Sequence, residues 1–364
     1  MSSPQRSARD PWLDNAKMAL VTLVVVGHAW AVLPGGGVVG HLYDFLYVWH
    51  LPAFVFVTGY LSRRFEYSRA RLWSLVRTLA VPYVLFECLL ALFRIWVGGE
   101  HLEDLFADPH WPMWFLTALI FWRLLTPPFR RMPAPVAIAI AVALSAASGI
   151  VTGEASDLLD LTRVAGLLPF FVLGLHASPA GLERLRAPAA RWAAVAVFAG
   201  IWFLSAYLDD LASTEWLYYR TPYDELGAGD VRGVLVRIAL AAVAVIGSLA
   251  FLALVPRFEG WFTRMGSMTL VVYLCHGFVV LGLEYAGYAE WAGDNPVLAP
   301  ILTFVGGVAL ALLLASPPVS RRLLYVVDPL GRAERQVTEA VQLNAVAQEA
   351  GSLPAMESQT VPPR

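Results

Sequence analysis

The stretch RDPWLDNAKMALVTLVVVGHAW opens with four charged residues, the last two of them Asp14 and Lys17, and continues as an apolar run that carries a histidine. Lys17 and His28 are eleven residues apart, or about three helical turns, so both lie on one stripe of a helix, with Asp14 close to it. An ammonium group can bind a phosphate, and a neutral imidazole can remove a proton near pH 7. The spacing therefore predicts one helix that carries an anion-binding cation and, farther along, a candidate general base.

A purely structural role for these residues is the alternative. Asp14 and Lys17 can simply pair at i, i+3 and reach the membrane interface, as such pairs commonly do near helix ends. Lys17 is the only lysine in the chain, which otherwise uses arginine, so a compact point charge is favoured there. His28 lies about 22 Å along the helix. An ionisable side chain that deep in a bilayer is a functional candidate unless it is only a hydrogen-bonded packing residue.

Further ionisable side chains interrupt other apolar stretches of the chain. From the rise of a helix we expect Arg77 at the depth of Lys17, Glu87 along the same path, His50 and His276 near the bilayer midplane, and Arg163 just inside the outer face. Buried charges are expensive in lipid, so this number of them predicts a polar cavity through the bundle. Such a cavity suits an enzyme with a phosphate-bearing ligand and a proton-coupled transporter equally well.

Composition identifies the elements that must position these residues. Hydrophobic residues make up 58% of the 364 residues, charged residues 15%, and the mean hydropathy is +0.61. These values predict an all-α, polytopic helical bundle rather than soluble domains. Ten stretches are long and apolar enough to span a bilayer. They are 13–33, 41–61, 72–97, 112–127, 133–151, 161–177, 189–208, 233–255, 266–286 and 297–317.

The loops between these stretches alternate in charge. Arginines gather near the N-terminus, in every second loop and after the last stretch, whereas the other loops are acidic. Because positive loops stay in the cytoplasm, the alternation predicts ten spans with both termini inside. Residues 1–328 would form the membrane domain, and residues 329–364 a polar, partly disordered tail. An N-terminal signal peptide is the rival interpretation, but no soluble domain follows it for export.

Several sequence motifs resemble membrane acyltransferases of the acyltransferase-3 family, in the branch of fucose 4-O-acetylase and related acetyltransferases. The resemblance starts in the stretch quoted above and continues through WHLPAFVFVTGYLSRR, VPYVLFE, PMWFLTALIF, LLPFFVLG and MGSMTLVVYLCHG, over roughly residues 9–285. It implies about ten membrane helices, an acyl-CoA donor from the cytoplasm as co-substrate, and transfer of a short acyl group to a hydroxyl, commonly on a sugar. It also implies that His28 is the essential histidine and Lys17 its basic partner. The chain lacks the Arg-x-x-Arg pair that well-studied members carry after the second helix.

These expectations combine into one hypothesis, a membrane O-acyltransferase of the cell membrane with no bound cofactor, no metal and no nucleic acid partner. The catalytic group is His28, with Lys17 and Asp14. His28 removes the proton of the acceptor hydroxyl, unless it first takes the acyl group itself. The donor-binding candidates are Arg77, Arg69 and Arg71, and the candidates on the acceptor side or cavity wall are His50, His276, Arg163, Glu87 and Trp114. A sugar or proton-coupled transporter is the alternative, although the inverted repeats typical of transporters are not evident; a structural or sensory protein is a third. The acceptor and the oligomeric state are not predicted.

Overall fold

The computed structural model describes residues 10–102, 109–152, 158–207 and 213–331, and every regular element in these ranges is a helix. The predicted all-α class is therefore confirmed. Most of the predicted tail, from residue 332 onward, lies outside the described residues. The helices are α1 (Pro11–Trp30), α2 (Gly37–Tyr47), α3 (His50–Ser62), α4 (Arg69–Leu75), η1 (Val76–Ala80), α5 (Val81–Trp96), α6 (Trp114–Arg131), α7 (Ala134–Ser148), η2 (Leu158–Asp160), α9 (Leu161–His176), α10 (Pro179–Arg184), α11 (Pro188–Ser205), η3 (Thr214–Tyr218), α13 (Asp230–Leu254), α14 (Trp261–Met265), α15 (Thr269–Tyr285), α16 (Tyr288–Asp294), α17 (Leu298–Ala315) and α18 (Pro317–Val327).

Each of the ten predicted stretches contains a long helix or a consecutive helix pair. Six helices within the described ranges are long and apolar enough to cross a membrane, or seven if the bent pair α15 and α16 counts as one span. The protein is thus a polytopic helical membrane protein. The number of ten spans and the cytoplasmic placement of both termini stay predictions.

Two predicted stretches are interrupted, and a proline explains each interruption. Pro52 has no N–H to bond to the carbonyl of Val48, and α2 gives way to α3 at Val48 and Trp49. Pro82 similarly has no N–H for Thr78, and the five residues of η1 before α5 form a π-helical turn. The regular α-helical hydrogen bonding is therefore interrupted once in each of these two stretches.

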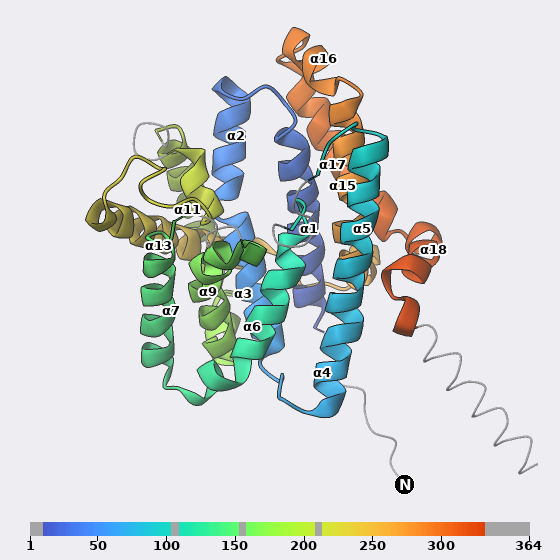
Figure 1. Ribbon diagram of the computed structural model, residues 1–364. Coiled ribbons are helices and arrows are strands. Elements are labelled where there is room, and N and C mark those ends of the chain that lie inside the picture. Colours follow the sequence, from blue (N-terminus) through green and yellow to red (C-terminus); the bar gives the residue numbers. More distant parts are fainter. Residues whose placement is uncertain (1–9, 103–108, 153–157, 208–212, 332–364) are drawn as a thin grey trace, which may run out of the picture.

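Helix α1 lies at the centre of the bundle, where it packs against α2, α3, α14, α15 and α17 (Figure 1). Helices α3 and α9 approach each other closely at two glycines. A Cβ atom on Gly59 would stand 2.1 Å from the carbonyl oxygen of Phe171, and one on Gly174 would stand 2.0 Å from that of Phe56. The two glycines let the backbones of α3 and α9 touch.

Some of the connections can be placed at one or the other end of the molecule. Helix α4 and the turn between α6 and α7 share one end, and α16 lies at the other (Figure 1). Arg69 and Arg71 are exposed on α4, and Arg130 and Arg131 end α6. The shared end is thus the arginine-rich one, as expected of the cytoplasmic side.

Candidate functional site

Two histidines from distant parts of the chain meet inside the bundle. Nδ1 of His28, on α1, lies 2.8 Å from Nε2 of His276, on α15, and their rings stack with centroids 5.1 Å apart. Nδ1 of His276 lies 2.7 Å from the backbone oxygen of Tyr273 and 3.1 Å from that of Val272. The packing of α1 against α15 creates this pair.

The backbone carbonyls assign the protons of both rings. A carbonyl oxygen only accepts, so Nδ1 of His276 carries the hydrogen, and Nε2 of the neutral ring holds a lone pair. His28 must then donate from its own Nδ1 to that lone pair. Its remaining nitrogen, Nε2, is left unprotonated, in a side chain that lines a cavity. An imidazole with this proton arrangement is ready to accept a proton from a ligand.

The cavity in front of His28 has a volume of about 270 Å³. Most of its wall is aromatic, and its polar groups are few, as in typical small-molecule sites. His50 lies on the wall, and its Nδ1 donates to the carbonyl of Leu46 at 2.8 Å, so its Nε2 is also an acceptor. The remaining lining residues are Val24, Ala31, Tyr43, Tyr47, Leu51, Phe54, Trp111, Pro112, Trp114, Phe115, Arg163, Tyr218 and Tyr273.

Arg163 contributes a cation to this cavity and is held on several sides. Its Nε donates to the carbonyl of Tyr218 at 3.1 Å, and its Nη1 to Asp160 at 3.3 Å. The guanidinium lies 4.5 Å from the ring centre of Trp114, a cation–π contact. Burial raises the pKa of the Tyr218 hydroxyl, which keeps its proton and lies 2.9 Å from that of Tyr43. The cavity therefore presents a positioned cation and hydroxyl groups close to the histidines.

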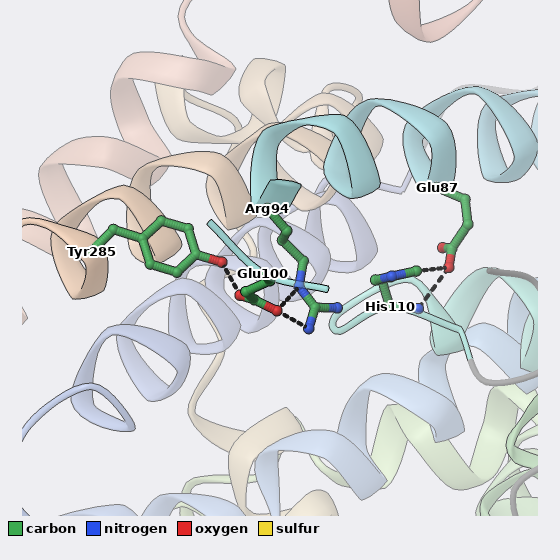
Figure 2. A network of polar contacts seen from close by, with 5 residues as sticks. All are labelled: Glu87, Arg94, Glu100, His110 and Tyr285. Atoms are coloured by element: carbon green, nitrogen blue, oxygen red, sulfur yellow. Dashed lines mark hydrogen bonds and ion pairs between the residues drawn. The ribbon is translucent and has the colours of Figure 1, made fainter. Parts of the chain in front are cut away.

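The loop between α5 and α6 forms part of the cavity wall and is fastened by two carboxylates (Figure 2). Glu87, on α5, accepts hydrogen bonds from the backbone N–H and the ring of His110, at 2.7 and 2.5 Å. Glu100 accepts from Arg94, at 2.8 Å from its Nε, and from Tyr285. The Arg94 hydrogen bond is the main reason why the pKa of the Glu100 carboxyl is lowered. Both ends of the loop are thus tied to helices.

A second cavity, of about 250 Å³, contains Lys17. The Nζ atom of Lys17 lies 2.7 Å from Asp14, and Arg123, on α6, adds a second cation to the wall. Phe54, Phe115 and Tyr273 line this cavity and the His28 cavity alike. The ring centres of Phe54 and Phe115 are 5.1 Å apart, and those of Phe115 and Tyr273 are 5.8 Å apart. These three rings form an aromatic partition between the two cavities.

The structure brings together only some of the predicted site residues. His28, His50, Arg163 and Trp114 line one cavity, with His276 bonded behind His28. Of the cationic candidates, Lys17 alone lines the second cavity. Arg77 lies in the π-helical turn and lines neither described cavity, and Arg69 and Arg71 are exposed on α4. Glu87 is fully buried against His110 instead of lining a cavity.

Several site residues were not predicted from the sequence. Arg123 could have been, because it is a charge inside the predicted stretch 112–127 and meets the criterion that selected Arg77. Trp111 packs on His28 with ring centres 4.4 Å apart, and no spacing in the sequence indicates that contact. Among the described residues, no group of three metal-ligating side chains could hold a metal ion.

Comparison with known proteins now adds the family. The model of the acyltransferase-3 family, described as an acyltransferase domain, matches residues 10–317. The chain belongs to the acyltransferase-3 family. The nodulation protein NolL of Mesorhizobium japonicum is 28% identical over 349 residues, which cover 87% of this chain and 89% of NolL. No solved structure matches.

Membership confirms the resemblance and favours the enzyme among the classes that the buried charges left open. The protein is a membrane-embedded acyltransferase, which requires an acyl donor and an acceptor. An acyltransferase needs a group that deprotonates its acceptor and a place for its donor. The two cavities are the candidates for these tasks.

Proposed function

We propose that the protein transfers a short acyl group, such as acetyl, from acyl-CoA to a hydroxyl group of a sugar or glycan acceptor at the cell membrane. The observation that carries the proposal is the position of His28 in the wall of a cavity, with its Nδ1 2.8 Å from Nε2 of His276 and Nδ1 of His276 2.7 Å from the Tyr273 carbonyl oxygen. This chain of contacts leaves Nε2 of His28 as a proton acceptor, which a general base needs.

The reaction follows from that proton arrangement. Nε2 of His28 takes the hydroxyl proton as the acceptor oxygen attacks the thioester carbonyl and forms a C–O bond. The C–S bond then breaks, and the resulting imidazolium returns its proton to the thiolate of CoA. Through both steps the Nδ1–H of His28 stays bonded to His276, so the ring keeps its orientation while its charge changes. Arg163 supplies positive charge in the same cavity.

Donor and acceptor occupy different cavities in this proposal. Lys17 and Arg123 offer two cations to the phosphates of acyl-CoA in the second cavity. The pantetheine arm then has to bring the thioester past the partition of Phe54, Phe115 and Tyr273 to reach His28. The acceptor enters the His28 cavity, where aromatic faces suit the C–H face of a sugar ring and the free nitrogen of His50 can accept a hydrogen bond from a hydroxyl.

Release of CoA tests the proposed reaction. Purified protein mixed with acetyl-CoA and a crude glycan extract should release free thiol, followed with a thiol-reactive dye, and mass spectrometry should find the acetyl group on the extract. Propionyl-CoA and butyryl-CoA serve as further donors. Failure of all three donors to release thiol would refute the proposal.

Lys17 tests the donor side of the proposal separately. Lys17→Ala should raise the KM for acyl-CoA about tenfold, because a charge-assisted bond to phosphate is lost, and kcat should change less, because such a contact binds ground and transition states alike. Lys17→Arg should keep the charge and most of the affinity. Arg186→Ala removes an exposed arginine paired with Glu183 and is the matched control. A Lys17→Ala enzyme with normal KM and reduced kcat would place Lys17 in the chemistry instead.

A further inference from the structure

Residues 110–112, which lie shortly before α6, connect the wall of the His28 cavity to two helices. The backbone oxygen of Pro112 accepts a hydrogen bond from the Tyr273 hydroxyl on α15. His110 is held by Glu87 on α5. Trp111, between them, packs on the ring of His28 with centroids 4.4 Å apart and an interplanar angle of 55°. The position of this indole therefore depends on contacts made by its two neighbours.

Burial of a carboxylate at position 87 is unfavourable for the stability of the fold. Its side chain is fully buried, and its Oε1 alone accepts both hydrogen bonds from His110, while no partner is assigned to Oε2 within the described structure. A half-satisfied buried carboxylate generally costs stability compared with an apolar residue of similar size. Stability alone does not account for a glutamate here, and the contact with His110 gives it another task.

We propose that Glu87, which fixes the backbone and ring of His110 (Figure 2), is a positioning residue that thereby holds Trp111 against His28. The proposal rests on the function proposed above, in which Nε2 of His28 must point at the acceptor. His276 fixes the ring at Nδ1, and the indole of Trp111 supports its face. Without Glu87 the indole loses its anchor, and the imidazole gains freedom that productive proton transfer does not tolerate.

Kinetics of matched variants test the proposal. Glu87→Ala should lower kcat by on the order of 10²-fold, the loss that a small misplacement near the reacting groups causes, and leave the KM for acyl-CoA unchanged. Glu87→Gln keeps an oxygen acceptor for both His110 donors and should recover most of the rate. In a Trp111→Ala background, Glu87→Ala should lower kcat by no more than roughly twofold. The reason is that each substitution alone already removes the support that Trp111 gives to the His28 ring. If the losses of kcat caused by Glu87→Ala and Trp111→Ala multiply in the double variant, the two residues act independently and the proposal is overturned.

A second measurement does not need the acyltransferase activity. Diethyl pyrocarbonate acylates an unprotonated imidazole nitrogen, and mass spectrometry of the peptide that contains His28 gives the rate. Glu87→Ala should speed this modification severalfold, and Glu87→Gln should not. If Glu87→Ala protein is not monodisperse, Glu87→Asp replaces it, since the shorter carboxylate cannot reach both donors.

Glu100→Ala is the matched control, because it removes the other carboxylate that fastens the same loop, whose hydrogen bonds are with Arg94 and Tyr285 and not with His110. It should leave both kcat and the modification rate within about twofold of wild type. The proposal would be contradicted if Glu87→Ala changed only kcat or only the modification rate of His28. It would also be contradicted if Glu100→Ala changed both as much as Glu87→Ala does. A wild-type enzyme that releases no thiol would instead refute the proposed function, and the modification rates would still test the position of Trp111.

Discussion

His28→Ala is expected to reduce the release of CoA thiol by about 10²–10⁴-fold, the range typical for loss of a general base. The KM for acyl-CoA should stay close to wild type, because His28 lines the cavity that does not contain Lys17. Steady-state rates at several donor concentrations, together with direct measurement of acyl-CoA binding by calorimetry, separate the two effects.

His41→Ala is the appropriate control for that variant. His41 is a histidine on α2 that bonds to the carbonyl of Trp202 and does not line the His28 cavity. Its loss should leave the rate unchanged. Normal turnover by a folded His28→Ala enzyme would remove the basis of the mechanism, and His28 would then be a packing residue.

His276→Ala is expected to have the second largest effect, a loss of about 10²–10³-fold in kcat with little change in either KM. The variant removes the lone pair that accepts from Nδ1 of His28, so the imidazole can place its proton on the wrong nitrogen and rotate. Steady-state kinetics with each substrate varied in turn measures the separation of kcat from KM.

His276→Gln distinguishes this role from simple packing. A glutamine oxygen can occupy roughly the position of Nε2 of the histidine and accept the same hydrogen bond, so we expect at least a tenfold recovery over alanine. Alanine and glutamine variants with equal activity, at equal thermal stability, would show that His276 does not act through the proton of His28.

The sequence predicts most of the fold because the membrane makes length and hydropathy decisive. All ten predicted stretches contain helices, and Pro52 and Pro82, near which the α-helices are interrupted, are visible in the sequence. What cannot be predicted is how each proline is accommodated. The π-helical turn before Pro82 takes up an additional residue, which turns the following face by about 100°.

The π-helical turn also helps to explain why the expected depth of Arg77 along its helix did not indicate that the side chain lines neither described cavity. Depth along a helix follows from the rise per residue, whereas the direction of a side chain depends on the rotation of the helix about its axis. His28, His50 and Arg163 meet in one cavity because their helices happen to present those faces to it. The pairing of His28 with His276, 248 residues away, depends on the packing of α1 on α15, which no local pattern encodes.

The contact between α3 and α9 has a consequence for genetics. His50 lies on α3 and Arg163 on α9, and the backbones of these helices touch at Gly59 and Gly174, where even a methyl group would overlap a carbonyl oxygen. A screen for inactive alleles would therefore recover substitutions at both glycines as readily as substitutions at His28. Immunoblots of membrane fractions would separate the two groups, because glycine alleles reduce the amount of inserted protein and His28 alleles do not.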